Sequence, residues 1–220
     1  MRHGPTLAGL LAVAVLAAGA QETGSQPTGG PEQYLTWSAK QAEAIGTNGY
    51  RRGRVGGIFD LRGLKTERSY NYKLAATWLT PDVIRATARL LQLRSRLSVE
   101  ETRALVEEAG AVPGTVVIVE IDPREGSGVI PSDWETFLQP KDQPARATRG
   151  ALRPDLREVR ALAGVLRRNF DYDRFWVSFP LEKDGTSTFD KTTVSAELVV
   201  RIHEKEGRVE WPVPPSITAR

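Results

Sequence analysis

Residues Thr115–Ile121 read TVVIVEI, a run of apolar and β-branched residues broken only by Glu120. A strand that buries one face alternates apolar with polar residues, whereas a continuous run is typical of a strand buried on both faces. We therefore expect residues 115–121 to form a central strand. The segments on either side of it decide which kind of sheet it belongs to.

Upstream, the pattern changes from the period of a strand to that of a helix. Residues 69–79 alternate apolar and polar side chains, which indicates a half-buried strand. Residues 81–96 follow a capping threonine and begin with a proline at the first helical position. Ser98 and Glu101 have the spacing of a capping box, which predicts a second helix that ends near Gly110. The two helices should form a hairpin inserted between strands.

Downstream, the pattern is mainly that of antiparallel strands. A further helix is predicted over residues 154–168, and alternating strands over residues 174–181, 194–202 and 208–213. Closely spaced prolines around the end of the last strand predict that it lies at an edge of the sheet. Early helices and late strands favour the α+β class, with an antiparallel sheet or a small β-sandwich and an inserted helical hairpin.

Residues 1–20 have the order of a secretory signal peptide. One arginine precedes an uncharged apolar run that is too short to span a bilayer, and a small-x-small cleavage site follows. Residues 21–31 are predicted to be a flexible linker, residues 32–215 a single domain and residues 216–220 a loose tail. The sequence thus predicts an exported protein, periplasmic or secreted, with no membrane insertion after signal cleavage.

The composition excludes several kinds of site. The chain has no cysteine, and signal cleavage would leave His203 as its only histidine, so the usual zinc, haem and iron–sulfur ligand sets cannot be assembled. A cysteine nucleophile is excluded, and a Ser-His-Asp triad would depend on His203 alone. Loss of Arg2 with the signal peptide lowers the net charge from +3 to +2, which does not favour nucleic-acid binding. We expect no cofactor.

Residues 46–67 are rich in glycine and carry Arg51, Arg52 and Arg54. A glycine-rich loop with several arginines can hold a phosphate or another anion. The segment lacks the Gly-Lys-Ser/Thr ending of a nucleotide-binding loop, and a plain surface loop explains the same composition. The three arginines are candidate ligand-binding residues.

The predicted central strand runs out into acidic residues. Glu120 and Asp122 are expected on the same side of the strand and Glu125 in the loop that follows, and two such carboxylates can act as general acid and base in glycosidic cleavage. Asp122, Glu125 and Asp133 are weak candidates for calcium ligands, because their spacing departs from that of a calcium-binding loop. An ordinary strand end followed by a loop is the favoured interpretation.

Two tryptophans are candidates for stacking on a sugar ring. Trp134 falls in the predicted loop, and Trp176 falls on the polar side of its strand. Packing in the core or beneath a loop explains most such residues, so packing is the favoured interpretation for each and sugar stacking is the alternative.

Together these features favour an exported, non-catalytic binding or accessory protein. It would act on an unknown protein or glycan partner through the arginine-rich segment and the loop between Asp122 and Trp134. A carboxylate-dependent hydrolase acting on a polysaccharide is one alternative, with Glu120, Asp122 and Glu125 as its candidate residues. A structural protein of the cell envelope is the other.

Overall fold

A computed structural model of the chain describes residues 30, 32–56, 71–123 and 130–218. The chain divides into two compact units, Met1–Gly30 and Pro31–Arg220, and the fold is that of the second unit. The predicted signal peptide, almost all of the predicted linker and Glu125 lie outside the described residues.

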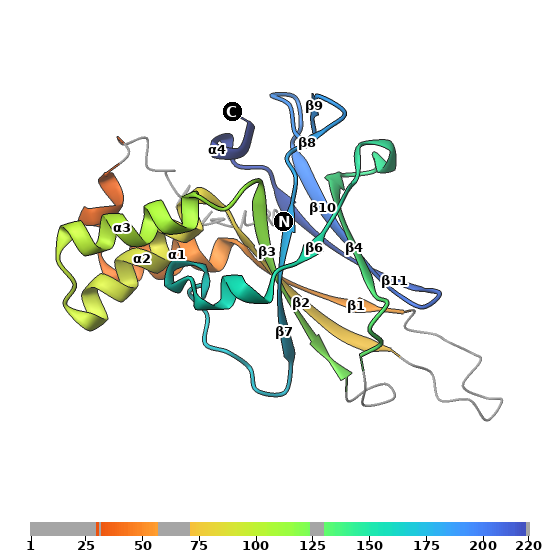
Figure 1. Ribbon diagram of the computed structural model, residues 1–220, viewed down its shortest axis with the longest axis horizontal. Helices are drawn as coiled ribbons and strands as arrows, with labels where there is room; N and C mark the ends of the chain where they lie inside the picture. The colour runs from red at the N-terminus through yellow and green to blue at the C-terminus, as the bar shows by residue number, and fades with distance from the viewer. Residues whose placement is uncertain (1–29, 31, 57–70, 124–129, 219–220) are drawn as a thin grey trace, which may run out of the picture. The chain divides into compact units, whose positions relative to one another are not determined.

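Among the described residues, one antiparallel sheet of nine strands dominates the unit (Figure 1). The strands are β1 (Tyr50–Val55), β2 (Tyr72–Leu79), β3 (Thr115–Asp122), β4 (Glu135–Pro140), β5 (Thr148–Arg149), β6 (Ala151–Leu152), β7 (Asp173–Phe179), β10 (Ser195–Ile202) and β11 (Lys205–Pro212). Their order in space is β5-β4-β10-β11-β1-β2-β3-β7-β6, and every neighbouring pair is antiparallel. A separate hairpin is made by β8 (Glu182–Lys183) and β9 (Thr186–Ser187).

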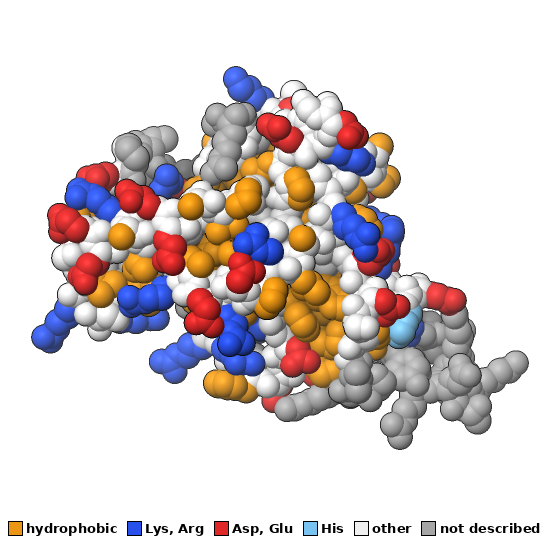
Figure 2. Space-filling model, viewed as in Figure 1, with side chains coloured by type: hydrophobic (Ala, Val, Ile, Leu, Met, Phe, Trp, Pro, Cys, Tyr) orange, Lys and Arg blue, Asp and Glu red, His pale blue; other side chains and the backbone are white. Residues whose placement is uncertain are grey.

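The two ends of this sheet are joined at Gly150, because β5 and β6 follow one another in the chain. β5 pairs with β4 and β6 pairs with β7, while the Gly150 N–H donates to the Thr136 carbonyl at 2.9 Å. The α+β class is confirmed, but the sheet forms a nearly closed barrel in place of a sandwich. The line between β4 and β7, bridged over part of its length by β5 and β6, is the seam. Figure 2 shows hydrophobic side chains gathered on the surface between β7 and β4.

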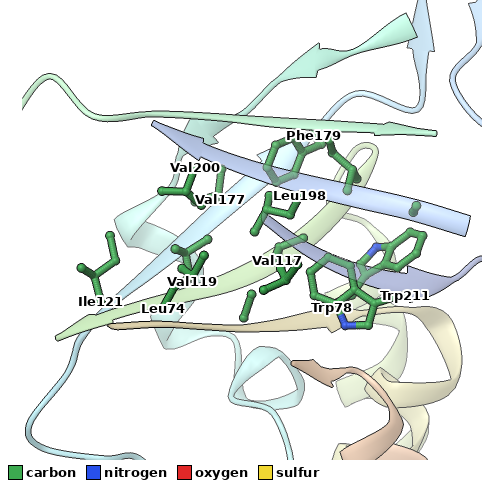
Figure 3. Packing of buried hydrophobic residues seen from close by; sticks show 14 of the residues in the cluster. Leu74, Trp78, Val117, Val119, Ile121, Val177, Phe179, Leu198, Val200 and Trp211 are labelled. Carbon is green, nitrogen blue, oxygen red and sulfur yellow. The ribbon is translucent and has the colours of Figure 1, made fainter. Parts of the chain in front are cut away.

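The interior of the barrel is a packed core (Figure 3). Inward side chains of β3, β7 and β10 meet there, and Trp78 packs on Trp211 with ring centroids 5.8 Å apart. Trp78 Nε1 donates to Thr115 Oγ1 at 2.8 Å and Trp211 Nε1 donates to the Gly49 carbonyl at 2.6 Å, so both buried indoles have partners.

β3 is buried on its outer face as well, which confirms the prediction from TVVIVEI. Its outward residues Val116 and Ile118 pack under the helical hairpin of α2 (Pro81–Ser95) and α3 (Val99–Gly110), which the chain inserts between β2 and β3. Figure 1 shows α1 (Ala39–Asn48), α2 and α3 together on one side of the strands. The short helices η1 (Gln33–Thr36), η4 (Pro144–Arg146) and α4 (Pro215–Thr218) complete the unit.

The predicted helix caps are also confirmed. Thr80 Oγ1 accepts from the Val83 N–H at 3.4 Å, and the Ser98 and Glu101 side chains exchange hydrogen bonds with each other's backbone at 3.1 and 2.7 Å. In the described part of the chain, no helix combines the length and the hydrophobicity needed to cross a membrane.

The predicted helix over residues 154–168 is wrong. Two short 3₁₀ helices, η5 (Pro154–Glu158) and η6 (Arg160–Leu162), occupy part of it. Val159 between them has extended backbone with ψ of 104°, and Gly164 has a left-handed φ of 75°. A continuous helix cannot pass through either conformation.

Two predictions about strands need correction. β11 is not an edge strand but lies between β10 and β1, and Pro212 is its last residue, where a missing N–H costs little. The segment around Arg51, Arg52 and Arg54 is not a loop but strand β1. Gly53 allows β1 to approach β11 closely, because a Cβ on it would lie 2.8 Å from Val209 Cγ1 in the barrel interior.

Candidate functional site

The outer face of β1, β2, β3 and β7 gathers most of the charged residues that the sequence predicts as functional. Strand register arranges them in two rows across the sheet. The first row is Arg52, Ala75, Glu120 and Arg174, and the second is Arg54, Lys73 and Asp122. Opposite side chains on neighbouring strands are close enough to interact, so each row joins charges that are far apart in the sequence.

Glu120 is held by an arginine from the neighbouring strand. Arg174 Nε and Nη2 donate to the same Glu120 oxygen, Oε1, at 2.9 and 2.8 Å. Only 8% of the Glu120 side chain and 10% of the Arg174 side chain are exposed. The carboxylate charge is therefore compensated inside the protein, as a buried charge must be.

Asp122 is buried beside a lysine. Its carboxylate lies 3.6 Å from Lys73 Nζ, with 6% of the Asp122 side chain exposed against 45% of the Lys73 side chain. Tyr172, just before β7, is the next group along this row. Burial raises the pKa of the Tyr172 phenol above its usual value, and the negative charge of Asp122 raises it further. At neutral pH the phenol is thus protonated and able to donate a hydrogen bond.

Arg52 is exposed, whereas Lys73 is only partly exposed. Arg52 Nε donates to the Tyr50 hydroxyl at 2.9 Å, and the guanidinium carbon lies 5.6 Å from the centre of the Tyr50 ring. The hydrogen bond with Tyr50 raises the pKa of Arg52, and Tyr172 interacts with it electrostatically. We call the group Tyr50, Arg52, Lys73, Asp122 and Tyr172 the tyrosine–cation face.

The other two arginines of β1 differ in placement. Arg54 is exposed opposite Lys73. Arg51 falls on the other side of the strand and donates to the carbonyls of Glu210, Asn48 and Tyr50. The bond to Glu210 links β1 to β11, so Arg51 has a structural role in addition to any part in binding.

The two candidate tryptophans lie apart from the tyrosine–cation face. Trp176 is on the outer face of β7, where it packs with the helical hairpin and its Nε1 donates to the Leu162 carbonyl at 2.8 Å. Trp134 is 9% exposed and packs on Phe175 with ring centroids 5.0 Å apart. Both indoles are engaged in packing, and their role in sugar binding stays a prediction.

Asp133 belongs to a different region, beside the seam. It helps to line a pocket of about 370 Å³ whose walls come from residues 132–136, 149, 150 and 152.

Among residues 30, 32–56, 71–123 and 130–218, no group of three or more His, Asp or Glu could hold a metal ion. Because Glu125 is outside these residues, a calcium site made with it stays a prediction.

Sequence reasoning missed three members of the tyrosine–cation face, namely Tyr50, Lys73 and Tyr172. Alternation along β3 predicted that Glu120 and Asp122 share a side, but not which residues lie opposite them. That information depends on the pairing of β2 and β7 with β3. A strong pattern within one strand does not determine its register with the next.

Comparison with protein-family models, with curated proteins and with solved structures finds no match to this chain. An accessible guanidinium, a half-buried ammonium and two partly exposed phenols can attract an anion, donate hydrogen bonds to it and pack against a ring.

Proposed function

We propose that the chain is an exported, non-catalytic protein that binds an anionic saccharide chain on its tyrosine–cation face. Export rests on the signal-peptide pattern of residues 1–20. The observation that carries the binding proposal is the position of Arg52, which is exposed, is hydrogen-bonded to Tyr50 and interacts electrostatically with Tyr172.

Arg52 has the donors that such a ligand needs. Its Nε is used by Tyr50, whereas its two Nη groups have no hydrogen-bond partner among the described residues. A guanidinium recognises carboxylate, sulfate or phosphate through parallel hydrogen bonds. Lys73 adds an ammonium donor whose charge is balanced by Asp122, and the tyrosine rings offer flat surfaces for the apolar faces of sugar units.

Binding is favoured over hydrolysis by the placement of the two carboxylates. Glu120 and Asp122 lie on the same side of one strand, and each is beside a cation. A glycosidase needs two carboxyl groups that face each other across the substrate. The hydrolase alternative would therefore require a partner carboxylate outside the described residues.

Loss of Arg52 is expected to weaken binding of an oligogalacturonide about tenfold or more, as measured by isothermal titration calorimetry. A hydrogen bond to a charged group contributes roughly 1.5–3 kcal/mol, and about 1.4 kcal/mol corresponds to a factor of ten. Arg52→Lys should give an intermediate affinity, because the charge stays but the paired donors are lost. Binding should weaken as salt is raised.

The matched control is Arg94→Ala, which removes the same charge from the last turn of α2 and should leave affinity unchanged. A sulfated oligosaccharide and neutral cellopentaose distinguish the type of ligand. Equal binding of cellopentaose, or equal loss in both arginine variants, would contradict the proposal. Shortened oligosaccharide in the recovered sample would support the hydrolase, and large assemblies of the free protein would support the envelope role.

A further inference from the structure

The seam is bridged by hydrogen bonds over only part of its length. At the bridged end, β5 pairs with Phe137 and Leu138 of β4, and β6 pairs with Val177 and Ser178 of β7. The last bond on the β7 side runs from the Arg153 N–H to the Trp176 carbonyl at 2.8 Å. Beyond this point the chain turns away into η5, and β7 continues to Asp173 without a neighbour on that side among the described residues.

β7 therefore offers a free backbone position at Arg174. In an antiparallel strand, the N–H and C=O of one residue point to the same neighbour, and those of residues two apart point the same way. Because the Trp176 carbonyl faces the seam, the N–H and C=O of Arg174 face it too. The described residues provide them with no hydrogen-bond partner. An added strand could exchange two hydrogen bonds with Arg174.

The floor of the unbridged part of the seam is apolar. The Trp134 and Phe175 rings meet there, and Ile130 is partly buried against the same core. Leu152 is 49% exposed at the end of β6 and lines the pocket of about 370 Å³. Figure 2 shows hydrophobic side chains on the surface between β7 and β4. A side chain from an added strand would thus find apolar contacts with Trp134, Phe175 and Leu152, next to a pocket whose other walls are mainly polar.

The rim of the same region is acidic. Asp133, Glu135 and Asp173 lie along it, and Glu135 is paired with Arg149 at 2.7 Å. Asp133 and Asp173 are exposed and form no ion pair with other described residues. The uncompensated charge at the rim is therefore negative, which favours an occupant with lysine or arginine side chains.

We propose that the seam binds an extended, basic segment of a partner polypeptide as an added strand beside β7. Main-chain hydrogen bonds to Arg174 hold the segment, an apolar side chain packs on Trp134, Phe175 and Leu152, and basic side chains reach Asp133 and Asp173. This combination of a free strand edge, a side-chain pocket and a charged rim is how proteins recognise peptides by strand addition. The site uses other residues than the tyrosine–cation face, although Asp173 directly follows Tyr172 in the chain, and it does not depend on saccharide binding.

The test uses a capped seven-residue peptide of alternating lysine and valine, titrated into the protein and followed by calorimetry. Its counterpart with glutamate in place of lysine should bind at least tenfold more weakly. N-methylation of the central valine removes one main-chain donor and should lower affinity by a similar factor. In the protein, Asp133→Asn with Asp173→Asn should weaken the lysine–valine peptide about fivefold to tenfold.

Asp184→Asn is the matched control, because Asp184 is an exposed aspartate in the turn between β8 and β9, away from the seam strands. Leu152→Ser should also weaken binding without loss of folding, since Leu152 is half exposed. Failure of the lysine–valine peptide to bind, or equal binding after the aspartate changes, would overturn the proposal. So would a dimer of the free protein that Leu152→Ser dissociates, because the seam would then be occupied by a second copy.

Discussion

Arg174→Ala is expected to lower the free energy of unfolding by about 3–5 kcal/mol. The change leaves the Glu120 carboxylate 8% exposed and without its charged partner, and breaking a buried ion pair from one side costs this much. Urea denaturation followed by circular dichroism measures the effect. Glu120→Gln should also destabilise the protein, because it removes the same attraction.

The control for this prediction is Arg157→Ala. Arg157 pairs with Glu158 at 2.9 Å, but both side chains are mostly exposed, and such pairs contribute about 0–1 kcal/mol. The double variant Glu120→Gln with Arg174→Met should recover most of the stability lost in Arg174→Ala, because no unpaired buried charge remains. Equal, small losses for Arg174→Ala and Arg157→Ala would mean that Glu120 is not buried and is free for other chemistry.

Gly150→Ala is expected to destabilise the protein by about 1–3 kcal/mol, because the seam has no room for a methyl group. A Cβ on Gly150 would lie 2.7 Å from Phe179 Cε1 and closer still to Thr136 Oγ1 and Val177 Cγ1. Overpacking of this kind typically has that cost. Amide hydrogen exchange should be faster in β5 and β6 than in β2 and β3 of the same variant.

Gly110→Ala is the matched control for the same chemical change. A Cβ at this position in the last turn of α3 meets no atom within 4 Å, so the variant should be neutral or slightly more stable. If the two alanine variants unfold at the same urea concentration, the close contact at Gly150 is absent and the barrel is not closed there.

The elements that were predicted correctly have strong local signals. The TVVIVEI run indicated a strand buried on both faces, and β3 packs inward on the barrel core and outward on the helical hairpin. The capping residues Thr80 and Ser98 indicated where α2 and α3 begin. In each case the signal is contained in one segment and needs no knowledge of its neighbours.

The predictions that failed depend on contacts between distant segments. Closure of the sheet depends on Gly150 fitting between β4 and β7, and the sequence around it contains only a turn signal. The glycines of residues 46–67 resembled a loop, yet Gly53 permits the close approach of β1 to β11. A glycine placed for close packing and a glycine placed for flexibility look the same in a sequence.

The candidate site was predicted only in part for the same reason. Arg52 and Asp122 were singled out by charge and position, and alternation placed Glu120 with Asp122. Lys73 and Tyr172 join them through strand register, and Arg174 compensates Glu120 through the pairing of β3 with β7. Residue type indicated the candidates, whereas their partners and hence their chemistry required the fold.

The most direct test of the proposed function is an amide NMR titration of residues 21–220 with an oligogalacturonide. We expect the chemical shifts of Tyr50, Arg52, Lys73 and Tyr172 to change most, those of the seam residues Trp134 and Leu152 to stay constant, and the sugar signals to show no cleavage. Shift changes centred elsewhere, or no changes up to millimolar oligosaccharide, would contradict binding at the tyrosine–cation face. New reducing-end signals would contradict the non-catalytic role.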